Sequence, residues 1–352
     1  MGYISIHSNK NKELKRNILP TVKLDIFHPF LKKVYEMPIE KIELTPIDST
    51  DYNKVIMDFY QEFSNIQLYT PIKTSYQYKC VYFTLYASED SPLVHILIKI
   101  TNAMYKLFPN KPFAKIYVEL NERKRVVHKL LSFKELNKLG LGFTTAGLTY
   151  NNNIIVTKRE EADKLLLHEL FHLFDLQPPA ESSFIRWVND NWYTNSYNLY
   201  ETHCELMSII FHCLFLAIET ALVNDIHDYN VVEQLFAHFI KVERNYSLLL
   251  IQKVLKLHDI TPETFFNNNS KPLINDNIPA YTIARGILFY YLYQFTQLLN
   301  ADLSLKSNYV KGCIDILEQI YKNDEFISKC HFYISEPHDV SYIAQILVVY
   351  NH

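Results

Sequence analysis

The segment LLLHELFHLFD at residues 165–175 constrains the fold of this chain more than any other stretch. It places His168 and His172 four residues apart, with Glu169 directly after the first histidine, and Leu or Phe fills every other position up to residue 174. A helix that is apolar nearly all round is typically buried, and buried polar side chains are costly unless they are paired or bind a metal. The segment therefore predicts a buried helix whose three polar side chains share a partner.

The spacing HExxH suits a zinc ion. Residues four apart lie on one helix face, so both imidazoles can reach one point, while Glu169 flanks it about 100° around the axis. Zinc lowers the pKa of a bound water to about 7, and Glu169 can take its proton. We therefore expect metal-assisted hydrolysis with Glu169 as general base. A helical protein with a chance motif is an alternative, because a chain with 14 His would contain HExxH in roughly 3% of cases.

A third ligand is expected from the segment NLYETHCELMSII, which contains Glu201, His203 and Glu205. The segment is typical of a long helix, on which Glu201 and Glu205 share a face and His203 points away. One carboxylate can bind zinc while the other accepts the second ring N–H of a ligating histidine. Two acids on a solvated face, or a three-histidine site that includes His203, are the alternatives.

HELFH followed by ETHCE resembles the gluzincin branch of zinc metallopeptidases, in which HExxH is followed by a helical ExxxD. The resemblance implies that His168, His172 and Glu201 bind zinc and that Glu169 is the base. Glu205 stands where the family usually has Asp, so its hydrogen-bond partner is left open. The run from AGLTY through HELFH to YETHCE is also loosely similar to uncharacterised zincin-like proteins of large DNA viruses.

The order of elements before the motif predicts a mixed sheet. Strands are expected at 78–87 and 113–120 with a helix at 91–108 between them, which makes a βαβ unit. Residues 148–157 predict a hairpin with its turn at 151–153.

Residues 143–149 are the candidate edge strand. Its free N–H and C=O groups would take an extended peptide, with Thr145 and Gly147 binding substrate. A hairpin connection without a role in recognition is equally compatible with the pattern.

The C-terminal part is expected to be helical, with helices at 231–257, 281–299 and 310–323 that close the cleft. Tyr281 could bond the tetrahedral oxyanion and Arg285 a substrate carboxylate. An ordinary helix N-terminal surface is the alternative. A further helix is predicted at Asp51–Ile66. The chain then divides into an N-terminal region (1–77), a zincin-like catalytic region (78–225) and a helical region (226–352).

Composition limits the remaining classes. A net charge of −3 gives no support for nucleic acid binding. Five cysteines without CxxC spacing and no N-terminal apolar leader favour the cytoplasm, the host cytoplasm if the chain is viral. Residues 206–223 are interrupted by His212 and Glu219, which favours a core helix over a membrane span.

We therefore expect an α+β zincin-like fold and a cytoplasmic zinc metallopeptidase that acts on a peptide or protein. A non-catalytic structural or interaction protein on the same scaffold is the second class. The oligomeric state stays open.

Overall fold

The computed structural model of the protein describes residues 24–38, 45–46, 74–78, 81–86, 92–119, 147–150, 152–156, 162–179, 182–192, 199–257, 260–267 and 277–332. The strands are β1 (Thr45–Pro46), β2 (Thr74–Tyr78), β3 (Val81–Tyr86), β4 (Lys115–Glu119), β5 (Gly147–Tyr150) and β6 (Asn153–Val156). The longer helices are α4 (Pro92–Leu107), α6 (Ala162–Leu173), α7 (Ser182–Trp192), α8 (Leu199–Val223), α9 (Tyr229–Leu257), α11 (Asn277–Tyr290) and α13 (Tyr309–Gln319). Shorter helices are α2 (His28–Tyr35), α10 (Pro262–Asn267), α12 (Leu292–Thr296), the 3₁₀ turn η1 (Ile320–Lys322) and α14 (Asp324–Phe332).

The strands form one mixed sheet in the order β1-β2-β3-β4-β6-β5. The predicted βαβ unit is confirmed: β3 and β4 are parallel, with α4 as the crossover that parallel neighbours need. The strand predicted at 78–87 is β3, which pairs antiparallel with β2. β2 was not predicted, and it crosses the boundary expected after residue 77. The sheet therefore begins within the segment assigned to the N-terminal region.

The predicted hairpin at 148–157 is confirmed as β5 and β6. Tyr150 pairs with Asn153, so the connection is two residues long. Asn152 lies in this connection with φ of 61°, a left-handed conformation that Asn tolerates better than most side chains. β6 is parallel to β4, and β5 lies at the end of the sheet. Of the predicted edge strand, residues 147–149 belong to β5, and residues 143–146 lie outside the described residues.

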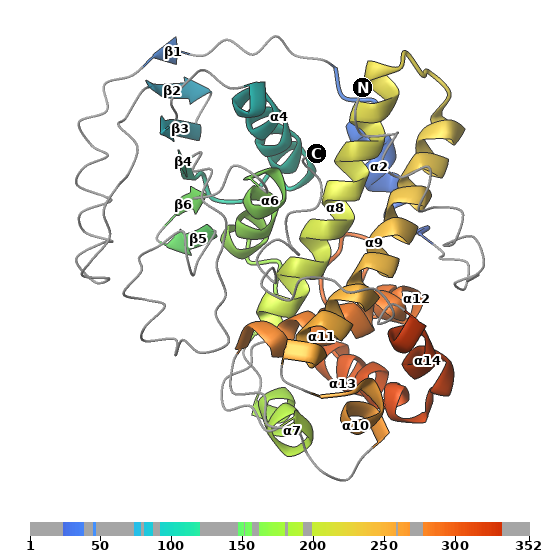
Figure 1. Cartoon of the computed structure of the whole chain (residues 1–352). Coiled ribbons are helices and arrows are strands. Elements are labelled where there is room, and N and C mark those ends of the chain that lie inside the picture. Colours follow the sequence, from blue (N-terminus) through green and yellow to red (C-terminus); the bar gives the residue numbers. More distant parts are fainter. Residues whose placement is uncertain are drawn as a thin grey trace.

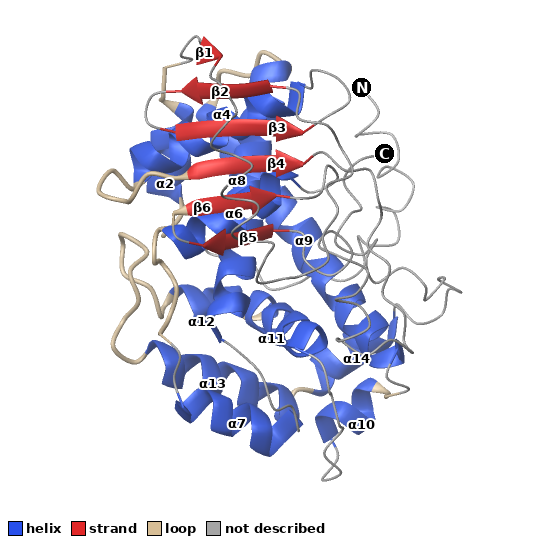
Figure 2. Cartoon of the chain, turned by 90° about the vertical axis from the view of Figure 1, so that its left-hand side faces the viewer, coloured by secondary structure: helices blue, strands red, loops and turns tan. Residues whose placement is uncertain are grey.

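Helices cover one face of the sheet in successive layers (Figure 1, Figure 2). α6 packs against β5, β6, α4 and α8, while α8 packs in turn against α9 and α11. This layering leaves α6 between the sheet and α8, so the HELFH residues are enclosed on both sides. The buried hydrophobic side chains of these layers form one continuous core.

The expected helical C-terminal part is confirmed, and with the mixed sheet it makes the fold α+β. Residues 231–257 lie in α9, and residues 281–299 contain the end of α11 and α12, with a break at Tyr291. Residues 310–323 contain α13 and η1. α2, α7, α10 and α14 were not predicted, and the helix expected at Asp51–Ile66 lies outside the described residues.

α8 is long and apolar enough to cross a membrane by length and composition, but 67% of its most apolar window is buried inside the protein. Its one histidine within that stretch has a partner, because His212 Nε2 lies 2.9 Å from Asp163 Oδ2 at the start of α6. Burial opposes both charges, yet the ion pair lowers the pKa of Asp163 and raises that of His212. The polar interruption of α8 therefore ties it to α6.

Candidate metal centre

Local interactions at both ends of α6 fix the position of the HELFH residues. Asp163 in its first turn accepts the backbone N–H of Lys164 at 2.8 Å. At the other end Asp175 adopts φ of 49°, and the N–H groups of residues 175 and 176 bond the carbonyls of His172 and Phe171. This is the Schellman pattern, which ends a helix and turns the chain back on itself. Phe171 then packs edge-on against Phe211, with ring centroids 5.3 Å apart, and so holds α6 on α8.

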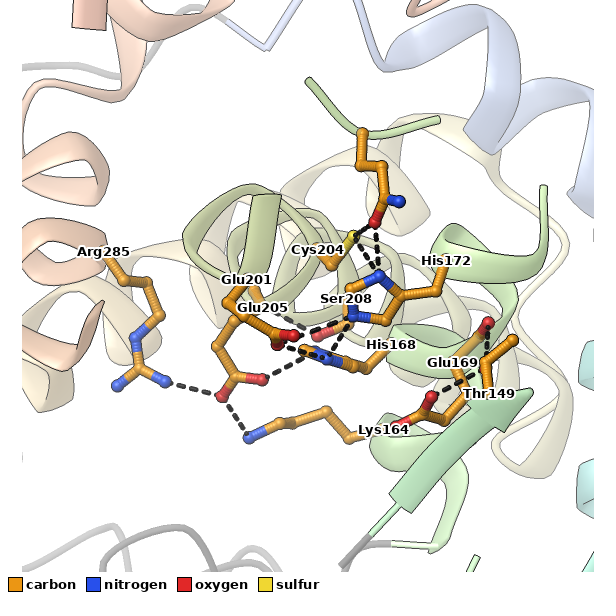
Figure 3. Close-up of polar contacts among 11 residues, drawn as sticks. Thr149, Lys164, His168, Glu169, His172, Glu201, Cys204, Glu205, Ser208 and Arg285 are labelled. Carbon is orange, nitrogen blue, oxygen red and sulfur yellow. Dashed lines mark hydrogen bonds and ion pairs between the residues drawn. The ribbon is translucent and has the colours of Figure 1, made fainter. Parts of the chain in front are cut away.

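Three ligand atoms from α6 and α8 converge on one point (Figure 3). Nε2 of His168 and Nε2 of His172 are 3.0 Å apart, and Oε2 of Glu201 lies 3.2 Å from the first and 3.5 Å from the second. Ligands at zinc distances in a tetrahedral arrangement are about 3.3–3.4 Å from one another. The three atoms therefore have the mutual spacing of a tetrahedral zinc site.

The opposite nitrogen of each histidine has its own acceptor. Nδ1 of His168 lies 3.1 Å from Oε2 of Glu205, and Nδ1 of His172 bonds Oε1 of Gln177. A carboxylate or amide oxygen accepts, so each Nδ1 carries a hydrogen, and the Nε2 atom of each ring faces Glu201. Three such acceptor atoms lie stably together only with a proton or a metal cation between them.

The charges favour such a cation. Burial lowers the pKa of His168, but hydrogen bonds to Glu201 and Glu205 outweigh it and raise the pKa to about 10. Burial raises the pKa of Glu201, whereas the hydrogen bonds to His168 and His172 lower it far more, so Glu201 is ionised. A proton or a metal ion is therefore stabilised at this point, and a metal ion would have to displace the proton.

The carboxylate of Glu205 forms ion pairs with two cationic side chains. Its Oε1 lies 2.7 Å from Nη1 of Arg285 and 3.0 Å from Nζ of Lys164, on the side away from His168 (Figure 3). Burial raises the pKa of Glu205, but Lys164, His168 and Arg285 together lower it well below its usual value. Arg285 is only 1% exposed, so it differs from the substrate-binding residue expected from the sequence. Its guanidinium bonds the carboxylate that orients His168.

His203 lies away from the cluster, as the helix phase predicted. Its Nδ1 is 2.7 Å from the hydroxyl of Tyr309 on α13, and the side chain is buried. Burial lowers its pKa to about 3, so the ring is neutral. The arrangement does not favour the three-histidine alternative.

The side chain of Glu169 extends from α6 toward the edge strand β5. It is 4% exposed, and its Oε2 accepts a hydrogen bond of 2.7 Å from the hydroxyl of Thr149. Burial raises the pKa of its carboxyl. Gly147, two residues before Thr149, leaves room for it, because a Cβ at that position would lie 2.5 Å from Oε1 of Glu169. Gly147 is therefore placed next to the expected base, and its expected contact with substrate stays a prediction.

The structure does not place every candidate residue. Thr145 lies outside the described residues. Tyr281 belongs to α11, but its side chain also lies outside what is described, so its expected role at the oxyanion stays a prediction.

Among the residues that contact the candidate site, sequence reasoning missed Lys164, Gln177 and Thr149. Lys164 precedes His168 by four residues and so shares its helix face, which was an available signal. Gln177 reaches His172 only because the Schellman turn reverses the chain, and the bond of Thr149 depends on how β5 packs on α6. Neither of these last two contacts has a signature in residue spacing.

Comparison with known proteins gives one distant relative. An uncharacterised protein of Acanthamoeba polyphaga mimivirus is 25% identical over 203 residues, which are 55% of this chain and 50% of that protein. The chain thus spans about half the length of the curated relative it matches. No protein-family model and no solved structure matches the chain. The similarity relates the chain to a viral protein and carries no activity with it.

Proposed function

We propose that this chain is a zinc metallopeptidase of the gluzincin type, with a zincin-like catalytic region. The observation that carries the proposal is the convergence of three ligand atoms, from His168, His172 and Glu201, with the second ring nitrogens of the two histidines held by Glu205 and Gln177. Half-buried ligand atoms held in this way can bind a divalent cation, which displaces the proton that otherwise lies between them. Nitrogen and carboxylate ligands in tetrahedral spacing fit zinc.

The chain's own residues divide the chemistry between them. Zinc, when bound, would polarise the scissile carbonyl and lower the pKa of a bound water. Glu169 would accept the proton of the attacking water at its carboxylate and return it to the leaving amine. Its raised pKa suits this exchange, because a base with a pKa closer to neutrality also donates readily. Glu205 and Gln177 keep the two histidines in the tautomer that ligates.

A peptide substrate is proposed because β5 is an edge strand beside the base. An extended peptide can add to such an edge through main-chain hydrogen bonds, which bring its carbonyls alongside the neighbouring side chains. The resemblance to gluzincins supports the same substrate class.

Metal removal tests the proposal. The purified chain is expected to hold about one zinc, to hydrolyse fluorescein-labelled casein, and to lose that activity in a chelator and regain it with added zinc. Zinc content is measured by mass spectrometry and hydrolysis by fluorescence. A zinc-loaded chain without activity on casein or a peptide library would favour the non-catalytic scaffold. A chain that takes up no zinc would contradict both.

Gln177→Ala is expected to weaken zinc binding by about 10- to 100-fold, because the second nitrogen of His172 loses the acceptor that fixes its tautomer. The dissociation constant is measured by competition with a zinc-binding dye. Gln252→Ala is the control, since Gln252 is a buried glutamine that bonds the carbonyl of Lys329 in α14, away from the candidate site. Equal zinc affinity in the Gln177 and Gln252 variants would show that the Gln177 contact does not orient His172.

A further inference from the structure

One face of β5 is directed at the carboxylate of Glu169. Side chains alternate along a strand, so positions 147 and 149 share a face, and this face contacts α6. Both carboxylate oxygens of Glu169 contact this face. Oε2 accepts a hydrogen bond from the hydroxyl of Thr149, and Oε1 lies so close to Gly147 that a Cβ at that position would clash with it. The carboxylate is thus confined by two positions of one short strand, of which Figure 3 shows Thr149.

The Thr149 hydroxyl has two acceptors within reach. One is Oε2 of Glu169 at 2.7 Å, and the other is the backbone carbonyl of Glu169 at 3.0 Å. A hydroxyl donates a single hydrogen, and the shorter contact, to the carboxyl oxygen, is the stronger one. The Thr149 hydroxyl thus lies within hydrogen-bond distance of both the side chain and the main chain of Glu169.

The main-chain groups of Thr149 face the edge of the sheet. Tyr150 and Asn153 close a two-residue hairpin and therefore form a hydrogen-bonded pair. Such pairs alternate in an antiparallel ladder, so the main-chain N–H and C=O of Thr149 point away from β6. Among the strands that the structure describes, β5 pairs with β6 alone. Thr149 thus presents its main chain to an incoming strand and its side chain to the base.

We infer that Thr149 is a positioning residue for Glu169, and that Gly147 is required at its position to leave space for the carboxylate. The inference rests on the proposed peptidase function and adds how the base is aligned with substrate. A peptide that adds to β5 through Thr149 would lie in fixed register with the carboxylate that Thr149 holds. Alignment of this kind matters because a displacement of about 1 Å can cost on the order of 100-fold in rate.

The test compares Thr149→Val with Thr149→Ser in the zinc-loaded full chain. Valine keeps the shape and loses the hydroxyl, whereas serine keeps the hydroxyl. The first readout is casein hydrolysis at saturating and subsaturating concentrations. The second is the dissociation constant of acetohydroxamic acid, a zinc chelator that also hydrogen-bonds a neighbouring carboxylate and needs no known substrate. Thr101→Val is the matched control, because Thr101 is a buried threonine in α4 whose hydroxyl bonds the carbonyl of Leu97.

Thr149→Val is expected to lower kcat by about 10- to 100-fold, with KM changed less than about twofold. It is also expected to raise the dissociation constant of acetohydroxamic acid by about 10-fold. Thr149→Ser is expected to restore both within about threefold, and Gly147→Ala to lower kcat at least as much as Thr149→Val. Zinc content is expected to stay the same in all of them.

If Thr149→Val has the same kinetics and the same affinity for acetohydroxamic acid as the wild type, the inference is overturned while the peptidase proposal stands. A Thr149→Ser variant as defective as Thr149→Val would also overturn it, because packing rather than the hydroxyl would then be responsible. If the wild type binds zinc but hydrolyses nothing, the peptidase proposal fails, and the acetohydroxamic acid series still decides whether Thr149 holds Glu169. A wild type without zinc overturns both.

Discussion

Glu169→Gln is expected to lower the peptidase rate by about 10²- to 10⁴-fold while zinc stays bound, which is the usual contribution of general base catalysis. Glutamine has the size and shape of glutamate, and its amide oxygen can still accept the hydrogen bond from Thr149. What it loses is the ability to take a proton. Glu169 is absent from the three converging ligand atoms, so the zinc affinity has no reason to fall.

The measurement is kcat on labelled casein together with the zinc content of the same sample. Glu243→Gln provides the control, because Glu243 is a buried acid on α9 outside the cluster and the chemical change is identical. An unchanged rate in Glu169→Gln would mean that another group is the base. A loss of zinc in this variant would instead make Glu169 a ligand.

Glu201→Ala is expected to empty the zinc site. Glu201 supplies the one anionic atom of the cluster, 3.2 Å and 3.5 Å from the two histidine nitrogens. Its removal leaves two neutral ligands, and the loss of a ligand is more severe than the 10- to 100-fold expected for Gln177. Zinc is measured after dialysis against a metal buffer that leaves the wild type loaded.

His203→Ala is the matched control for Glu201→Ala, since His203 lies on the same helix two residues later and bonds Tyr309 instead. It is expected to retain zinc. Glu205→Ala should fall between the two, because Glu205 contacts His168 at the nitrogen away from the cluster. If His203→Ala loses zinc and Glu201→Ala keeps it, the helix phase is wrong and a three-histidine site replaces the proposed one.

The parts of the fold that could be predicted are those in which local chemistry decides the conformation. HELFH is flanked by Leu or Phe on both sides, the hairpin turn contains Asn152 with positive φ, and α4 is preceded by a strand and followed by another. Helix phase was sufficient to separate His203 from Glu201 and Glu205, because all three lie on one long helix, α8. Periodicity predicts well which side chains share a face of a single helix or strand.

The parts that could not be predicted depend on contacts between elements. Arg285 looked like a residue at the start of its helix, but α11 begins at Asn277, so Arg285 lies inside the helix and against α8. Its partner Glu205 is 80 residues away in sequence. β2 is short and polar at Thr74 and Ser75, so no apolar alternation marks it as a strand. Pairing with β3 supplies its stability, and this is a tertiary effect.

Anomalous diffraction at the zinc absorption edge tests the central claim most directly. For crystals of the full chain grown with zinc, we expect one peak about 2.0–2.2 Å from Nε2 of His168, Nε2 of His172 and a carboxylate oxygen of Glu201. Glu169 should be close to the peak without binding it. A zinc-containing crystal without a peak between these three atoms, or with its peak at His203, would contradict the account.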